Sequence, residues 1–416
     1  MCSYFSSSLL LSFTRAFFAK KMRWLLGAAL LAAAARAQPF VGPAANGSLV
    51  LRPAAGQHVL VDGVAFQAIV DRLDAQKEQI NHLSRQISTQ LHSLKCTATA
   101  DTTSIVGLGG TDMWVGGVLA PNGKIYGMPY SAGSVLILDP ASNTADVTSI
   151  AVANGGAYWA GGVLAGNGKI YGMPSNANAV LVIDPATNAA DFSTITVPIS
   201  DNKWVFGVLA GNGKIYGTPH YANSVLIVDP ATNATDATSM AGFDSSSKWI
   251  GGTLAVNGKI YCLPAGASAV LIIDPDTNTT DTTSITVPVG GAKWWGGVLA
   301  ANGKIYGIPR DATSVLVINP VTNMADITTM TGLRGPWAGG VLAPDGKIYG
   351  IPLSATSVLI IDPATNTTDT TSVTVPGGNL KWRGGVLAAN GKIYGIPARA
   401  DSAMVIHSMC TVTGGL

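Results

Sequence analysis

A segment that opens with tryptophan recurs seven times in this chain, each copy close to Trp-x-Gly-Gly-Val-Leu-Ala-x-Asn-Gly-Lys-Ile-Tyr-Gly. The spacings between successive tryptophans are 45, 45, 45, 45, 43 and 45 residues. The seven are Trp114, Trp159, Trp204, Trp249, Trp294, Trp337 and Trp382. A fixed period in this range indicates an array of equal supersecondary units, none of which buries its own faces alone.

Each repeat divides into four expected strands, which we call a to d. In the first repeat they are 115–120, 124–128, 134–138 and 146–150. Asn122-Gly123 predicts a type I′ hairpin between strands a and b, and Asp139-Pro140 begins a turn between c and d. Four antiparallel strands in about 45 residues are typical of a propeller blade. The predicted fold is therefore an all-β, seven-bladed propeller.

The two ends of the array complete each other. The last repeat stops after strand c, whereas residues 100–105 match residues 280–285, which belong to a strand d. We expect this N-terminal strand to close the ring, which removes an open sheet edge. Cys96 and Cys410 then fall at adjacent turn positions of one blade, which predicts a disulfide. It would close a loop of about 300 residues and stabilise the fold by more than ~4 kcal/mol.

The first 37 residues carry five basic residues and no acidic one, so the remainder has a net charge of −3. A basic stretch, the apolar run 24–35 and the small-x-small motif Ala35-Arg36-Ala37 predict a secretory signal peptide over 1–37, with Met22 as a possible alternative start. The apolar run is shorter than the ~20 residues that a bilayer requires. We therefore expect a secreted, extracellular or endomembrane-lumen protein, with no integral membrane segment after leader removal. No basic stripe indicates nucleic-acid binding.

Between the leader and the repeats lie two further segments. Residues 38–63 predict a short β-like segment. Residues 64–95 carry an apolar heptad of the kind found in short coiled coils, so we expect a helix that forms a homo-oligomer. A lone amphipathic helix packed on the repeats is the alternative. The propeller itself is expected over 96–416. Four glycosylation sequons fit an exported protein, at Asn46, Asn233, Asn278 and Asn366.

The repeat resembles the kelch repeat, through its Gly-Lys-Ile-Tyr strand and its Asp-Pro-Ala-Thr-Asn turn, over about residues 97–412. It departs from kelch at Gly127-Met128-Pro129, where kelch has a double glycine, and it lacks the tryptophan that follows Thr-Asn. Its Asp-x-x-Thr-Asn core is also similar to bacterial YVTN-type propellers. The resemblance implies the fold and leaves the function open, because propellers serve as binding modules, scaffolds and enzymes.

The seven repeated tryptophans have two interpretations. They are large apolar wedges between blades, or they form a ring of stacking platforms for sugars or other flat ligands. For the other repeated residues, a role repeated in every blade favours structure over a single active site. Strand-b lysines such as Lys124 are expected on a solvated rim, and aspartates such as Asp139 and Asp146 on turns.

A single functional site should break the repeat pattern. The deviations cluster after strand b and before strand a, in loops that emerge on one face of an antiparallel blade, and loops on a rigid scaffold commonly carry function. We therefore predict a binding face there. Its candidate residues are Tyr130, Asn176, His220, Tyr221, Arg310, Asp311, Arg399, Trp295 and Arg383, together with the seven repeated tryptophans.

Recognisable catalytic signals are sparse. The repeats hold two histidines, His220 and His407, and no glutamate. No phosphate loop, nucleophile elbow or metal-spaced His/Cys cluster is present, so we expect neither a metal nor a cofactor. The favoured function is a binding module for carbohydrate or protein, multivalent through its stalk. The alternatives are a propeller hydrolase or lyase with one site at the channel mouth, for example at Arg310 and Asp311, and a structural or adhesive coat protein.

Overall fold

The computed structural model describes residues 40–43, 49–52, 60–61, 64–65, 71–79, 82, 94–152, 158–198, 200–244 and 246–412. The chain divides into two units, one formed by residues 1–95 with 410–416 and the other by residues 96–409. In the first unit, β1 (Phe40–Pro43) pairs with β2 (Leu49–Arg52), and β3 (Leu60–Val61) pairs with β4 (Val64–Ala65). Residues 71–79 and 82 are helical. This agrees with a helix in 64–95, and the predicted coiled-coil pairing remains a prediction.

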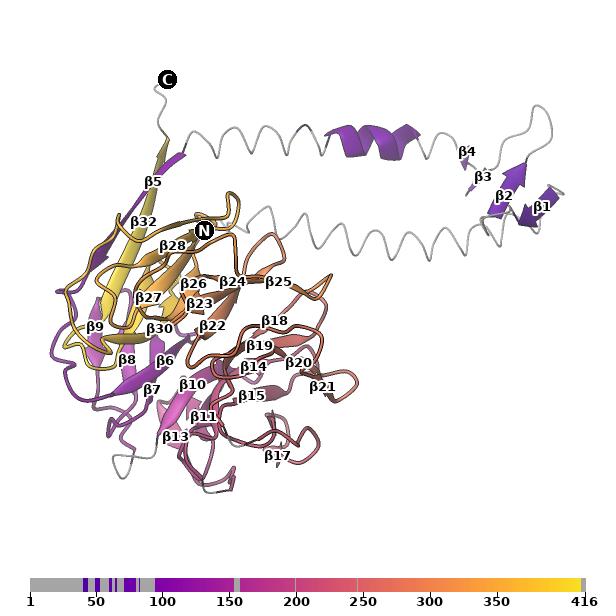
Figure 1. Ribbon diagram of the computed structural model, residues 1–416. Helices are drawn as coiled ribbons and strands as arrows, with labels where there is room; N and C mark the ends of the chain where they lie inside the picture. The colour runs from indigo at the N-terminus through magenta and orange to yellow at the C-terminus, as the bar shows by residue number, and fades with distance from the viewer. Residues whose placement is uncertain are drawn as a thin grey trace. The chain divides into compact units, whose positions relative to one another are not determined.

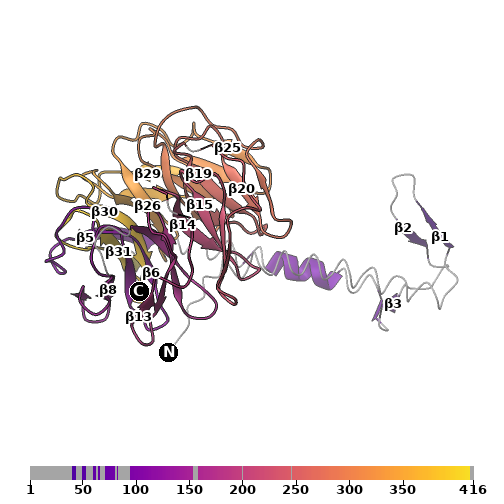
Figure 2. The same cartoon turned by 90° about the horizontal axis from the view of Figure 1, so that it is seen from below.

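The repeats form seven antiparallel sheets of four strands each, as the sequence predicts (Figures 1 and 2). The first three are β6 (Trp114–Leu119), β7 (Ile125–Pro129), β8 (Leu136–Asp139) and β9 (Thr144–Asp146); β10 (Trp159–Leu164), β11 (Ile170–Pro174), β12 (Leu181–Asp184) and β13 (Ala189–Asp191); and β14 (Trp204–Leu209), β15 (Ile215–Pro219), β16 (Leu226–Asp229) and β17 (Ala234–Asp236). The next three are β18 (Trp249–Leu254), β19 (Ile260–Pro264), β20 (Leu271–Asp274) and β21 (Thr279–Asp281); β22 (Trp294–Leu299), β23 (Ile305–Pro309), β24 (Leu316–Asn319) and β25 (Met324–Asp326); and β26 (Trp337–Leu342), β27 (Ile348–Pro352), β28 (Leu359–Asp362) and β29 (Thr367–Asp369).

The seventh sheet closes the ring. Its order is β30 (Trp382–Leu387), β31 (Ile393–Pro397), β32 (Met404–Val412) and β5 (Leu94–Asp101), so the N-terminal strand completes the C-terminal blade as predicted. Strand a of blade 7, β30, also contacts strand a of blade 1, β6. The side chains of Cys96 and Cys410 lie outside the described residues, so their disulfide remains a prediction.

The Gly-Gly pair of the repeat has a structural reason. In every blade, strand a carries a bulge between its tryptophan and the second glycine, for example between Trp114 and Gly117. The first glycine adopts the left-handed conformation that the bulge needs, as at Gly251 with φ 74°. These positions also meet around the axis of the propeller, because a Cβ on Gly251 would lie 2.9 Å from Gly296 Cα. Neighbouring blades therefore approach one another closely at these glycines, where a side chain would not fit.

Two local predictions were wrong in detail. Strand d of the first blade is Thr144–Asp146 rather than 146–150, because the Asp146 carboxylate accepts hydrogen bonds from the backbone N–H of Thr148 (2.7 Å) and Ser149 (3.1 Å) and so turns the chain. The a–b hairpin is not type I′. Only Gly123 has positive φ, and its N–H donates to the Ala120 carbonyl at 3.0 Å. This pattern is typical of a three-residue hairpin loop with a left-handed glycine.

Candidate functional site

The repeated tryptophans are part of the core. Each is between 0% and 4% exposed, and each indole N–H donates to a backbone carbonyl of its own blade, as Trp337 does to Ser357 at 2.8 Å. Each ring packs against the preceding blade, as Trp159 does in one cluster with Tyr126. The wedge interpretation is therefore confirmed. The alternative of exposed stacking platforms at Trp114, Trp159, Trp204, Trp249, Trp294, Trp337 and Trp382 is wrong, because no ring face is left for a ligand.

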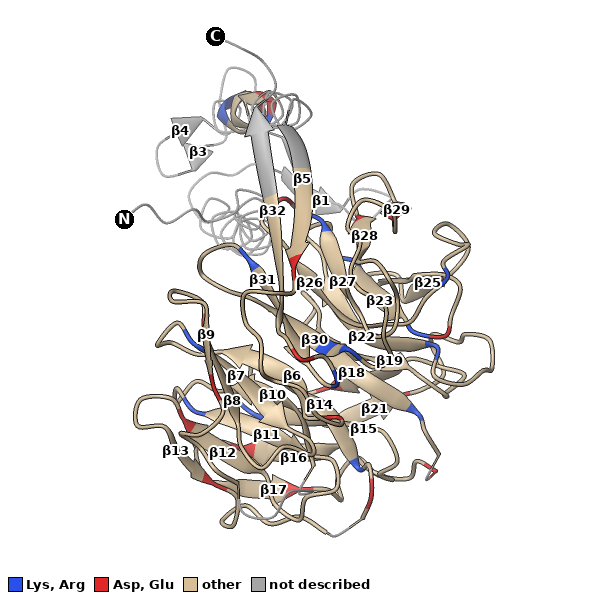
Figure 3. Cartoon of the chain, turned by 90° about the vertical axis from the view of Figure 1, so that its left-hand side faces the viewer, with Lys and Arg blue, Asp and Glu red and all other residues tan. Residues whose placement is uncertain are grey.

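The repeated polar residues also have structural partners. Asn122 donates to the Tyr126 hydroxyl and to the Pro185 carbonyl of the next blade, both at 2.9 Å. Four of the strand-b lysines pair with a carboxylate at the end of strand c, the shortest pair being Lys259 and Asp274 at 3.0 Å. Figure 3 shows how sparse charge is over the blades. These contacts stabilise turns and blade interfaces.

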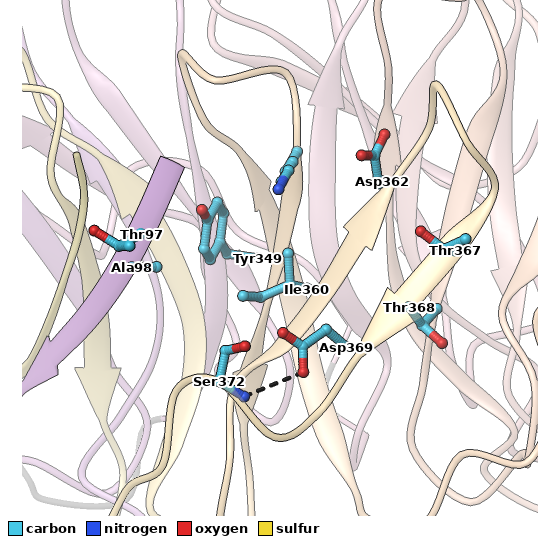
Figure 4. A pocket seen from close by; sticks show the side chains of 10 residues that line it. Thr97, Ala98, Tyr349, Ile360, Asp362, Thr367, Thr368, Asp369 and Ser372 are labelled. Atoms are coloured by element: carbon cyan, nitrogen blue, oxygen red, sulfur yellow. Dashed lines mark hydrogen bonds between the residues drawn. The ribbon is translucent and has the colours of Figure 1, made fainter. Parts of the chain in front are cut away.

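Grooves of the same kind recur between neighbouring blades. One, drawn in Figure 4, has a volume of about 320 Å³ and is lined by Thr97 and Ala98 of β5 and by Tyr349, Asp369 and Ser372 of blade 6. In it, the Asp369 carboxylate accepts a hydrogen bond from the Ser372 backbone N–H at 3.1 Å. Burial opposes the shift, but hydrogen bonds from the Ser372 side chain, from Thr371 and from the Ser372 backbone together lower the Asp369 pKa to about 2. The groove is built from residues that recur in other blades, so it is a product of the repeat.

The variable loops do share one face. The backbone N–H of His220, after strand b, donates to the carbonyl of Lys203, before strand a, and Arg310 bonds Lys293 in the same way, both at 2.9 Å. At the axial end of this face, the second residues of strands a form a cluster that includes Val115, Ala160, Val205 and Ile250. Tyr130, Phe206 and Trp295 pack against it. Because these residues come from blades 1 to 5, the cluster surrounds the propeller axis.

Two arginines stand over the indole of Trp295. The guanidinium carbon of Arg310 lies 5.1 Å from the ring centroid and that of Arg383 lies 5.8 Å from it, and Arg383 is also 6.0 Å from the Tyr130 ring. These distances are typical of cation–π contacts. We call Tyr130, Phe206, Trp295, Arg310 and Arg383 the axial cluster. Four of the five were predicted as site residues from their failure to repeat.

Asp112 is the carboxylate that balances part of this charge. It pairs with Arg383 at 3.0 Å and with Arg399 at 2.8 Å. Burial alone would raise the pKa of Asp112, but the hydrogen bond from Arg399 and the charge of Arg383 lower it below its usual value. Asp112 is therefore ionised and fixes both arginines. Arg310 has no such partner among the described residues.

His220 lies beside the axial cluster. Its Nε2 is 2.7 Å from the Ser247 hydroxyl, and its ring meets Tyr221 edge-on with centroids 4.6 Å apart. Burial, assisted by the charges of Lys248 and Arg310, lowers the His220 pKa to about 4. The imidazole is therefore neutral at physiological pH. Its Nδ1 is buried and has no hydrogen-bond partner within the described part of the chain.

The remaining predicted residues occupy the surrounding loops. Asn176 donates to Asp201 at 3.1 Å and accepts from the Asn202 backbone N–H at 2.8 Å, so it ties two loops together. Asn202 lies 3.5 Å from the Tyr130 hydroxyl. Asp311 is exposed in a hollow beside Arg310. The structure thus brings the predicted non-repeating residues onto one face, with Arg399 joined to the cluster through Asp112.

Phe206 and Asp112 were missed from the sequence. Phe206 replaces the left-handed glycine of strand a, yet it keeps that conformation with φ 63°. A bulky residue there costs of order 1–2 kcal/mol, and such outliers concentrate at functional sites. Its ring lies toward blades 1 and 2, because a Cβ on Gly116 would come within 2.8 Å of Phe206 Cε1. The break in the Gly-Gly pattern was the available signal.

Within the described residues, no group of three or more His, Cys, Asp or Glu side chains could hold a metal ion. Among the same residues, no helix has the length and apolarity needed to cross a membrane. Cys262 is buried and free, and burial raises its pKa to about 12.

No family model matches the sequence, and comparison with curated proteins finds no match either. Solved structures do share the fold. A streptogramin B lyase is 12% identical, with 76% of this chain and 98% of that chain covered and a TM-score of 0.58. Virginiamycin B lyase from Staphylococcus aureus is 11% identical, with 75% and 99% covered and a TM-score of 0.61. The extracellular domain of a putative hybrid two-component system from B. thetaiotaomicron is 11% identical, with 71% and 40% covered and a TM-score of 0.54. At these identities, the comparisons establish the seven-bladed propeller, without a specific likeness to kelch proteins.

Proposed function

We propose that this protein is an exported ligand-binding module that takes one ligand at the axial cluster. The observation that carries the proposal is a set of buried polar atoms, three in the axial cluster and one beside it, that have no hydrogen-bond partner in the described part of the chain. They are Arg310 Nε, Arg383 Nε, Trp295 Nε1 and His220 Nδ1. Buried polar groups nearly always have hydrogen-bond partners, so four unpaired atoms in and beside one cluster call for an explanation. A bound ligand with its ordered water would supply one.

The surroundings suit a small ligand that has both a flat face and polar groups. Trp295, Tyr130 and Phe206 provide apolar surface, and the arginines provide donors in fixed positions. Ligand sites are typically lined by apolar side chains with a few polar groups among them. Carbohydrate remains a candidate ligand, since sugars also combine apolar faces with hydroxyl groups. The buried tryptophan ring removes the basis for one sugar site in every blade, so multivalency would have to come from oligomerisation through residues 64–95.

The fold comparisons are compatible with export, because one of the similar structures is the extracellular domain of a putative hybrid two-component system. Alternatively, the ligand is a protein that contacts the whole face formed by the variable loops. A coat or adhesive role would not need the unpaired arginine and indole groups near the axis. We therefore favour a discrete ligand over a purely structural role.

A hydrolase or lyase is the second candidate, and the 2.7 Å contact between His220 and Ser247 favours it. Similar folds include lyases, one of them a catalytically inactive histidine-to-alanine variant with quinupristin. The low pKa of His220 leaves its imidazole neutral and able to accept a proton, but as a weak base. No described carboxylate orients its Nδ1. Binding is therefore the better-supported function.

The test is a binding screen with the intact protein against a glycan array and a panel of small aromatic and polar compounds, with each hit also followed for turnover. Trp295→Ala should abolish binding, whereas Lys304→Gln, on the opposite turn of the same blade, should not affect it. Turnover that disappears in His220→Gln would favour the enzyme. Hits that bind Trp295→Ala as tightly as the wild type would overturn the proposed site.

A further inference from the structure

One repeat is shorter than the others at the place where its loop meets the axial cluster. Asp326, which ends strand d of blade 5, precedes Trp337 by 11 residues, whereas the equivalent interval is 13 residues in the other repeats, as between Asp281 and Trp294. The shortened connection is Leu333-Arg334-Gly335-Pro336, in which Gly335 has a φ of 142°. The deletion therefore changes one loop of the variable face and leaves the blades intact.

The residue directly before Trp337 also differs from its equivalents in three other blades. In three other blades, a buried lysine directly before the tryptophan donates to the b–c loop of the preceding blade. These contacts are Lys203 with Ala177 O (2.9 Å), Lys293 with Ala267 O (2.9 Å) and Lys381 with Ala355 O (2.6 Å). Before Trp337 the residue is Pro336, which has no donor. A hollow of about 320 Å³ remains between blades 5 and 6.

Two arginines line this hollow. Arg310 comes from the b–c loop of blade 5 and Arg334 from the shortened connection, and the carboxylate of Asp311 also lies on the wall. Neither arginine has an ion pair or a side-chain hydrogen bond among the described residues. Arg310 is half-buried, and its guanidinium carbon lies over the Trp295 ring at 5.1 Å from the centroid. The indole therefore restrains the guanidinium, while its buried Nε has no hydrogen-bond partner among the described residues. Its neighbour Arg383 is already occupied by Asp112.

A fixed guanidinium with free N–H groups is the geometry that recognises oxyanions. Its planar fork matches a carboxylate or a phosphate with two parallel hydrogen bonds, and such charge-assisted bonds are about twice as strong as neutral ones. Arg334 adds a second positive charge on the same wall, against one negative charge at Asp311. The local charge therefore favours an anion. Trp295 is not one of the residues that line the hollow, but its indole contacts Arg310, so a ligand bound to Arg310 could extend toward it.

We propose that the hollow between blades 5 and 6 binds the carboxylate or phosphate group of a small ligand through Arg310 and Arg334. This rests on the proposed function, because Arg310 belongs to the axial cluster and links that cluster to the hollow. It narrows the ligand to an oxyanion, with the rest of the molecule lying against Trp295. A neutral sugar would leave both arginines unpaired.

The test is isothermal titration calorimetry of the full chain at low ionic strength, with inorganic phosphate, acetate and benzoate as probes. We expect binding of at least one anion, with benzoate tighter than acetate if the indole contributes. Preference between phosphate and acetate tells which kind of oxyanion the site takes. Arg310→Gln should weaken binding at least tenfold, which corresponds to about 1.4 kcal/mol.

Two further variants guard against a simple folding defect. Arg310→Lys keeps the charge but loses the planar fork, so we expect a weakening of several-fold. Arg334→Gln changes an exposed residue and should weaken binding by a smaller factor. Lys304→Gln is the matched control and should bind as the wild type does. Anion binding that is unchanged in Arg310→Gln, or the absence of heat with all three anions for a folded wild type, would overturn the proposal.

The failure of this proposal is distinguishable from failure of the binding function. If neutral compounds bind and are lost in Trp295→Ala, while phosphate, acetate and benzoate do not bind, the axial site stands and the oxyanion assignment is wrong. If anions bind through Arg310 but Trp295→Ala changes nothing, the hollow is a separate anion site. That result would contradict the proposed function instead.

Discussion

His220 should make the stability of the propeller depend on pH in a defined window. Its side chain is largely buried beside the axial cluster, and its pKa falls from an ordinary 6.5 to about 4. The native state therefore keeps the imidazole neutral under conditions in which the unfolded chain protonates it. Between these two pKa values the unfolded state binds more protons, so the free energy of unfolding decreases as the pH falls. The contribution of His220 is complete above pH 6.5 and is lost by about pH 4.

The size of the effect follows from the size of the shift. A difference of about 2.5 pKa units, at 1.36 kcal/mol per unit, corresponds to roughly 3 kcal/mol of unfolding free energy. For a fold stabilised by of order 10 kcal/mol, that loss is large enough to measure. Aspartates such as Asp146 and Asp281, whose pKa values are about 2 because of hydrogen bonds from Ser149 and Ser284, act mainly at lower pH.

The assay is urea denaturation at pH 7, 5.5 and 4 for the wild type and for His220→Gln. The unfolding free energy of the variant should depend less on pH across this range. Between pH 7 and pH 4 the wild type should lose about 3 kcal/mol more unfolding free energy than the variant does. Comparison with the variant cancels the carboxylates and the other histidines, which both proteins share. Equal pH dependence in the two proteins would show that His220 titrates normally and that the burial argument is wrong.

Three further predictions concern the scaffold. Trp337→Phe should lower the unfolding free energy by about 2 kcal/mol, because it leaves the buried Ser357 carbonyl without its hydrogen-bond donor. Ligand binding should be unchanged. Normal stability with lost binding would instead support the interpretation of the tryptophans as stacking platforms for a ligand. Peptide mapping without reductant should find Cys96 linked to Cys410, and reduction should destabilise the ring by more than ~4 kcal/mol, whereas two free thiols would contradict the pairing. In a host that glycosylates, mass analysis should find glycans at Asn233, Asn278 and Asn366, whose exposed side chains make no hydrogen bond in the described residues. In blades without a sequon, the asparagine at the same turn position can be engaged, as Asn323 is by a hydrogen bond from a tyrosine at 2.9 Å. Unmodified peptides at all three sequons would refute this prediction.

The parts of the fold that were predictable from the sequence are those decided by local, repeated patterns. The period of the repeat predicts the seven blades. The similarity of residues 100–105 to a strand d predicts that β5 completes the last blade. Strand d itself was misplaced. A run that begins with Asp146 and continues with β-prone residues predicts a strand, but the carboxylate bonds the backbone just after it and ends the strand instead.

Most residues of the candidate site could be predicted from the sequence, but the contacts between them could not. Trp295, Arg310 and Arg383 stand out because they break the repeat. That both arginines contact the indole of Trp295 depends on how blades 5 and 7 are placed around the axis. This placement could not be predicted from the single sequence. Asp112 was missed for the same reason, because its partners Arg383 and Arg399 lie at the other end of the array.

The most direct test of the account is crystallographic screening of small fragments, including benzoate and phosphate, against the intact protein. The central claim is that function resides in the residues that do not repeat. Fragments should therefore collect at Trp295, Arg310 and the hollow between blades 5 and 6. If they occupied the grooves that recur between blades, such as the one lined by Tyr349 and Asp369, and left the axial cluster empty, the claim would be contradicted.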